Sequence, residues 1–134
     1  MNVLRPVVYD AGALIAAERN HAALWRAHRS YLTAGGLPLA PAPVVAQAWR
    51  DGARQAQLAR ILNGCEVPVL DHALARRVGA LLGQAATSDP VDGTVAVLAA
   101  DLGGVIVTSD PGDIQHLLDR LGPAGKRAEV APLH

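Results

Sequence analysis

Short apolar runs rich in β-branched residues alternate along this chain with longer stretches of helical periodicity. The runs expected as strands are residues 3–9, 37–40, 65–69, 105–108 and 128–130. Parallel neighbours need a crossover connection, and a helix is the usual one, so this alternation is typical of a parallel sheet with helices on its faces. We therefore predict an α/β fold with three layers and about five parallel strands.

The helical stretches between these runs have recognisable starts and ends. Helices are expected over residues 11–19, 21–34, 43–50, 53–62, 72–82, 90–102 and 111–121. Gly35 and Gly36 end the second helix, and Asp71 and Asp89 precede two others as N-caps. The helix after Asp89 carries an apolar stripe for the core, formed by Val91, Val95, Leu98 and Leu102.

Composition narrows the classes of protein that this chain can represent. Its 134 residues are 51% hydrophobic, which suits a single domain over residues 1–134 with a core of ordinary size. Twelve basic and twelve acidic residues cancel, so any contact with nucleic acid must be local. Cys65 is the only cysteine and no apolar run approaches a membrane span, so we expect a cytoplasmic protein without membrane contact.

Two stretches of the chain nearly repeat each other and place acids where helices begin. They are Ser-Asp-Pro-Val-Asp at 88–92 and Ser-Asp-Pro-Gly-Asp at 109–113. Helix capping alone explains each stretch, since Asp accepts the first free N–H groups and Pro suits the first helical position. Capping does not explain why a third acid, Asp10, also follows a strand-like run.

Parallel topology brings these acids to one edge of the sheet. Asp10 and Asp110 lie just past the carboxyl ends of two predicted strands, where such sheets bind ligands. Asp92, in the first turn of its helix, and Asp113, one turn beyond Asp110, can point at the same crevice. Crowded carboxylates are costly unless a cation neutralises them, and an all-oxygen site favours Mg²⁺ or Mn²⁺. Such a site suits the hydrolysis of phosphodiesters.

Four motifs together resemble the PIN-domain ribonucleases, and in particular the VapC-type toxins of bacterial toxin–antitoxin pairs. The motifs are VYDAGAL at 8–14, PVVAQAWR at 43–50, DPVD at 89–92 and VTSD at 107–110. The resemblance implies a PIN-like fold, a homodimer, Mg²⁺- or Mn²⁺-dependent cleavage of RNA and inhibition by a cognate antitoxin protein. It also implies that Asp10, Asp92 and Asp110 are catalytic and hold the metal, with Asp113 as an auxiliary acid.

Gln47 departs from the pattern of the family, most of which has a glutamate at this place. An amide accepts a hydrogen bond but brings no charge, so a second metal ion would be held less firmly. This substitution leaves a second hypothesis open, a weakened or inactive PIN fold that binds RNA or a partner peptide. A phospho-acceptor receiver domain is disfavoured, because Tyr9 rather than an acid precedes Asp10 and Lys126 is the only lysine.

Other polar residues are candidates for weaker roles. Ser109 lies between the acids and is a candidate for orienting water or a carboxylate, although a serine at a helix start commonly bonds its own backbone. Arg50, three residues after Gln47, is expected on the same helix face and is a candidate phosphate ligand. Further arginines that can line an RNA path, or can simply be solvated, are Arg19, Arg26, Arg29, Arg54 and Arg60.

Overall fold

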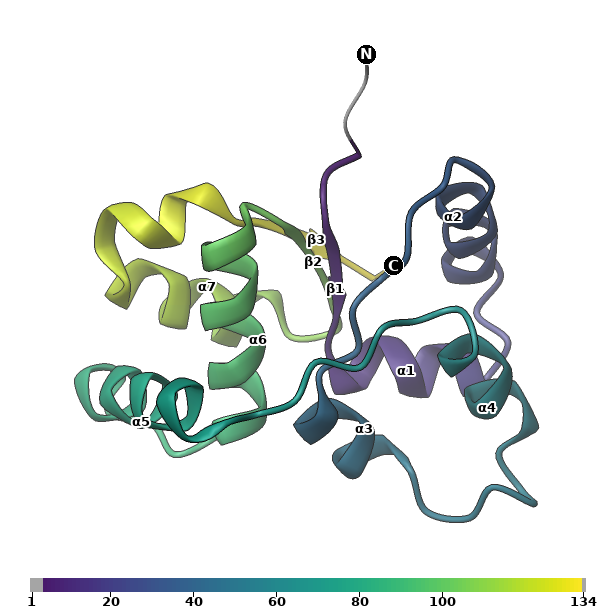
Figure 1. Ribbon diagram of the computed structural model, residues 1–134, viewed down its shortest axis with the longest axis horizontal. Helices are drawn as coiled ribbons and strands as arrows, with labels where there is room; N and C mark the ends of the chain where they lie inside the picture. The colour runs from purple at the N-terminus through teal and green to yellow at the C-terminus, as the bar shows by residue number, and fades with distance from the viewer. Residues whose placement is uncertain (1–3, 134) are drawn as a thin grey trace.

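The computed structural model describes residues 4–133 and has a central parallel sheet between two groups of helices. Helices α1 to α4 lie on one side of the strands in Figure 1, and α5 to α7 lie on the other. The strands are β1 (Val7–Tyr9), β2 (Val105–Thr108) and β3 (Glu129–Pro132). The helices are α1 (Ala11–Glu18), α2 (Ala22–Thr33), α3 (Ala42–Ala48), α4 (Ala56–Leu62), α5 (His72–Ala85), α6 (Pro90–Leu102), α7 (Pro111–Arg120) and a 3-10 turn η1 (Gly122–Arg127).

The predicted α/β class with three layers is confirmed, but the sheet has three strands among the described residues rather than five. Their order is β1-β2-β3, and both pairs are parallel. The expected strands at 37–40 and 65–69 are present only as single parallel bridges, which pair Leu39 with Val8 and with Glu66. The prediction that residues 1–134 form one domain stays a prediction, and Val3, the expected start of the first strand, lies outside the described residues.

Prolines explain why these two segments do not form longer strands. The first segment contains Pro38 and is followed by Pro41, and the second contains Pro68. A proline has no N–H to donate to a sheet, so each segment keeps only a few ladder bonds. The Leu39 N–H donates to the Val7 carbonyl at 2.8 Å, and the Glu66 N–H donates to the Pro38 carbonyl at 2.9 Å.

The core lies on both sides of β1 and β2. Val8 and Ile106 are fully buried in neighbouring strands, and Leu14 of α1 and Val95 of α6 are fully buried in the flanking helices. These helices are apolar on most sides, as expected for helices packed directly against a sheet. The stripe predicted from Val91 to Leu102 is only partly inward, because Leu102 is 45% exposed.

One helix ends earlier than its sequence pattern suggests. Helix α3 stops at Ala48, and Trp49 after it has an extended backbone with ψ of 133°. Arg50 therefore lies beyond the helix, and the prediction that Gln47 and Arg50 share a helix face is wrong.

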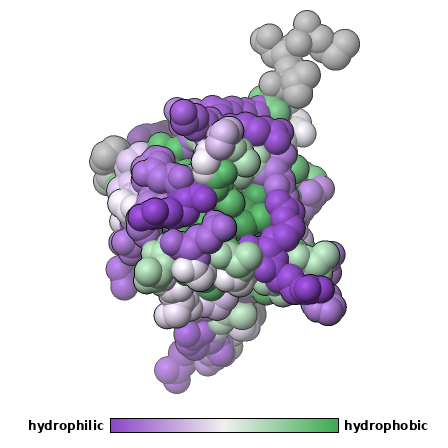
Figure 2. Space-filling view, turned by 90° about the vertical axis from the view of Figure 1, so that its left-hand side faces the viewer, coloured by the Kyte–Doolittle hydropathy of each residue, from purple (hydrophilic) through white to green (hydrophobic). Residues whose placement is uncertain are grey.

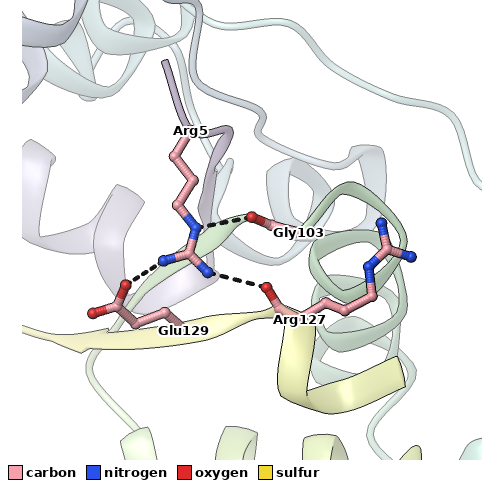
Figure 3. A network of polar contacts seen from close by, with 4 residues as sticks. All are labelled: Arg5, Gly103, Arg127 and Glu129. Carbon is pink, nitrogen blue, oxygen red and sulfur yellow. Dashed lines mark hydrogen bonds and ion pairs between the residues drawn. The ribbon is translucent and has the colours of Figure 1, made fainter. Parts of the chain in front are cut away.

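Arg5 fixes the segment before β1 to the end of α6, to η1 and to β3 (Figure 3). The Arg5 guanidinium donates to the Gly103 carbonyl at 2.9 Å and to the Arg127 carbonyl at 3.0 Å, and it forms an ion pair with Glu129. Gly103 ends α6 with φ of 66°, a left-handed conformation that glycine adopts without strain. This contact sets where β1, β2 and β3 begin relative to one another.

The side of the molecule that carries α5 and α7 faces the reader in Figure 2, where an apolar area is enclosed by hydrophilic side chains. Among the described residues, no helix is both long and apolar enough to cross a membrane.

Candidate active site at the ends of the strands

Asp10 stands directly after β1 and is buried, with 3% of its surface exposed. Its carboxylate caps α1 by accepting the Ala13 N–H at 2.8 Å. Its own N–H donates to the Val107 carbonyl of β2 at 3.2 Å, so the residue is tied to both strands at their carboxyl ends. Such ties hold the carboxylate in one orientation.

A buried threonine connects Asp10 with Asp110. Thr108, the last residue of β2, is fully buried, and its side chain hydrogen-bonds the Asp10 carboxylate. The same hydroxyl oxygen accepts the Asp110 N–H at 2.8 Å. Burial raises the pKa of Asp10, the charge of Asp110 adds to this effect, and the bond from Thr108 opposes it. Two acids far apart in the sequence thus share one small polar residue.

Asp92 carries the largest electrostatic perturbation in this group of acids. Its pKa is raised to about 7, first by burial and then by the charges of four neighbours, in the order Asp89, Asp10, Asp110 and Asp113. The four charges come from the starts of α1, α6 and α7, the three helices that begin near the ends of the strands. The structure therefore brings the acids Asp10, Asp92, Asp110 and Asp113 to one place.

Asp89 is a further acid of this site. The sequence indicated only that it caps a helix. Its carboxylate accepts the Val91 N–H at 2.9 Å and the Asp92 N–H at 3.2 Å, so it does cap α6. It also lines a pocket of about 220 Å³ together with Asp92, Asp113 and His116. The repeated Ser-Asp-Pro-x-Asp pattern was the signal for this, because it places two acids within one helical turn.

Ser109 and Gly12 approach each other beside Asp10. A Cβ atom at Gly12 would lie 1.9 Å from the Ser109 Oγ and 3.3 Å from the Asp10 Oδ1. Ser109 is therefore at the site, although the buried hydroxyl that joins the acids belongs to Thr108. Gly12 is required by this close approach, since any larger side chain would displace Ser109.

Gln47 and Arg50 are less closely joined to the acids. Gln47 is exposed on α3, a helix that packs against α1 and α6. The Arg50 guanidinium turns back to donate to the Ala46 carbonyl at 3.1 Å and to the Trp49 carbonyl at 2.7 Å. Arg50 thus bonds to carbonyls at the carboxyl end of α3, and it remains exposed to solvent.

The chemistry of the donors fits a hard divalent cation, since every acid at the site offers carboxylate oxygen. Within residues 4–133, no three His, Cys, Asp or Glu side chains form a group that could hold a metal ion in their present orientations. Side chains of Asp92, Asp110 and Asp113 would have to turn inward around an ion.

The fold and the position of the acids define a class. A parallel sheet flanked by helices, with acids past the carboxyl ends of β1 and β2, is the PIN-like arrangement expected from the sequence. A chain of VapBC2 from Rickettsia felis, crystallised bound to a DNA fragment from their promoter, superposes with a TM-score of 0.69 at 13% identity, covering 96% of this chain and 98% of that one.

A second solved structure has the same fold. PAE2754 from Pyrobaculum aerophilum superposes with a TM-score of 0.59 at 21% identity, covering 87% of this chain and 86% of that one. No family model matches the sequence, and no curated protein does. The likeness to both structures confirms the predicted resemblance to VapC-type PIN domains at the level of the fold.

Proposed function

We propose that this chain is a metal-dependent endoribonuclease that hydrolyses RNA phosphodiesters and serves as the toxin of a type II toxin–antitoxin pair. The observation that carries the proposal is the gathering of four carboxylates around that of Asp92, whose pKa is raised to about 7. Like charges this close are stable only with a proton or a cation among them. A reaction at phosphate is the chemistry that such a cation supports.

In this proposal Mg²⁺ or Mn²⁺ is held by Asp10, Asp92 and Asp110, with Asp113 as a further ligand. When bound, the ion neutralises the carboxylates and supplies Lewis-acid stabilisation to the attacked phosphate. The residues of the chain fix the geometry: the Ala13 N–H and the Thr108 side chain orient Asp10. Asp92 gives up its proton near neutral pH, so it is ready to accept a cation there.

The proposed partners are an RNA substrate, a cognate antitoxin protein and a second copy of this chain in a homodimer. The support for the antitoxin is the likeness to a chain of VapBC2. The proposals of an RNA substrate and of a homodimer rest on the resemblance of the sequence motifs to those of VapC-type toxins.

A second candidate is a PIN fold that binds RNA or a partner peptide without cleaving it. It is favoured by Gln47, which brings no charge to the site. Cleavage separates the two candidates.

The experiment is cleavage of a mixed pool of structured RNAs by purified protein with Mn²⁺ or with EDTA. We expect cleavage with Mn²⁺ only, and a loss of at least about 100-fold in Asp10→Asn and Asp92→Asn, because each substitution removes a ligand charge. Asp119→Asn is the matched control, since Asp119 is an exposed acid on α7 that accepts from Gln115 away from the site. Thermal melting verifies that each variant is folded.

Cleavage that persists in folded Asp92→Asn would refute the assignment of the site. Cleavage that persists in EDTA would refute the metal. A folded wild-type protein that binds RNA without cleaving it would favour the second candidate.

A further inference from the structure

One face of α1 forms the floor of a pocket that neither the metal proposal nor the fold explains. Gly12, Ile15, Ala16 and Arg19 follow each other at helical spacings of three, one and three, so they lie in one stripe. With His21, Ser109 and Leu133 they line a pocket of about 550 Å³. The floor is apolar, and its one permanent charge is Arg19.

One end of this pocket opens beside the acids. Gly12 lines it, and a Cβ at Gly12 would lie 3.3 Å from the Asp10 Oδ1. Leu133 is held at this end because its N–H donates to the Thr108 carbonyl at 2.8 Å. Ser109 stands between Leu133 and the acids in the lining. A ligand in the pocket therefore touches the edge of the proposed active site.

The other end of the pocket carries a positive charge. Arg19 follows Gly12 by seven residues, which is about 10 Å along a helix axis. It is exposed and enters none of the ion pairs found among residues 4–133. The ring of His21 caps α2 by accepting the Leu24 N–H at 3.2 Å, so Arg19 is the residue of the lining that is suited to an anion.

We propose that this pocket is the subsite for the nucleotide next to the scissile phosphate, with single-stranded RNA lying along α1. The flat face of a base packs on Ile15 and Leu133, and the following phosphate binds the Arg19 guanidinium, whose planar fork matches phosphate oxygens. The inference rests on the proposed function, since the direction of the strand is set by the acids.

An acidic peptide is the competing occupant, because a carboxylate also pairs with a guanidinium. RNA is favoured by the continuity of the pocket with Asp10, because a strand whose scissile phosphate lies at the proposed site must pass over this pocket.

The test is the binding of a labelled, mixed-sequence single-stranded RNA to the full chain by fluorescence anisotropy over a range of salt concentrations. EDTA is present, so that the readout depends neither on metal nor on cleavage. For Arg19→Ala we expect weaker binding and a plot of log affinity against log salt that is shallower by about 0.7, the loss of one phosphate contact. Arg19→Lys should restore the slope.

Matched controls come from outside the pocket. Arg76→Ala removes an exposed arginine of α5 and should leave the slope unchanged. Ile15→Glu should weaken binding several-fold, whereas Leu102→Glu should not, although the two side chains are similarly exposed at 39% and 45%.

Equal effects of Arg19→Ala and Arg76→Ala would overturn the subsite and leave the proposed nuclease standing. Displacement of the RNA by an acidic peptide whose own binding needs Arg19 would overturn the assignment to RNA. Binding that depends on Arg19, together with no cleavage in Mn²⁺, would support the subsite and refute the nuclease. No binding of RNA by the wild-type chain in EDTA would overturn the subsite, and cleavage in Mn²⁺ would then decide on the nuclease separately.

Discussion

Two uncharged residues determine the position of the Asp10 carboxylate. Thr108 hydrogen-bonds it from β2, and Gly12 leaves room for it and for Ser109 at the start of α1. Neither residue takes part in the proposed chemistry. Their effect is to keep a buried acid in one orientation beside other acids of the same charge, which repulsion would otherwise separate.

The contact at Gly12 predicts the effect of adding a methyl group. In Gly12→Ala the new Cβ overlaps the Ser109 Oγ, so we expect a loss of about 1–3 kcal/mol in the free energy of unfolding and a drop in RNA cleavage. Gly79→Ala is the control, because a Cβ at Gly79 in α5 meets nothing within 4 Å. We expect this control to gain about 0.5–1 kcal/mol. Urea denaturation measures both, and an equal stability of the two variants would contradict the account.

At the scale of residues, the sequence predicted the positions of the acids better than it predicted which polar side chain contacts them. Asp10 and Asp110 were expected past the ends of strands and are found there. Ser109 was the hydroxyl expected at the site, but the buried one is Thr108, which accepts the Asp110 N–H and lowers the pKa of Asp10. The alternation of side chains in a strand indicates that Thr108 is buried. It lies two residues after the fully buried Ile106 and so faces the same way.

At the scale of the elements, the start of the sheet depends on Arg5. Its side chain joins the segment before β1 to the end of α6 and to β3. We expect Arg5→Ala to lower the free energy of unfolding by about 1–2 kcal/mol, because two hydrogen bonds to backbone carbonyls are lost. Arg54→Ala is the control, since Arg54 is 88% exposed and its ion pair with Asp51 spans 3.7 Å.

Thermal melting of both variants tests this role. We expect the melting temperature of Arg5→Ala to fall below that of the wild type, and that of Arg54→Ala to stay almost unchanged. Two equal shifts would mean that Arg5 acts as an ordinary surface charge.

The helices were easier to predict than the strands. Helices α6 and α7 were expected because an Asp-Pro pair marks each start, and both begin at the proline. Strands depend on partners far away in the chain, and the prolines at 38, 41 and 68 reduced two expected strands to single bridges. The early end of α3 depends on the extended backbone of Trp49, for which the sequence carries no helix stop signal.

At the scale of the whole molecule, the site exists only because the chain folds. Asp10, Asp92 and Asp110 lie on separate elements, and the parallel order of β1 and β2 brings them together. The parallel topology expected from the sequence predicted that these three acids lie near one another. The sequence patterns did not predict the orientations of the carboxylates, because these depend on burial and on capping bonds such as those that Asp10 and Asp89 make.

Binding of a metal ion should depend on pH in a defined direction. The pKa of Asp92 is raised to about 7, so below this pH the side chain carries a proton that a cation must displace. Affinity for Mn²⁺ should therefore rise between pH 6 and pH 8, and protons should be released on binding at the lower pH.

Calorimetric titration of Mn²⁺ into the wild-type chain and Asp92→Asn, at pH values from about 6 to 8, tests the central claim most directly. The account predicts saturable binding to the wild type that strengthens with pH, and binding to Asp92→Asn that is at least about 10-fold weaker and depends less on pH. Equal binding of Mn²⁺ by the two folded proteins, or none by the wild type, would contradict the claim that these acids hold a divalent cation.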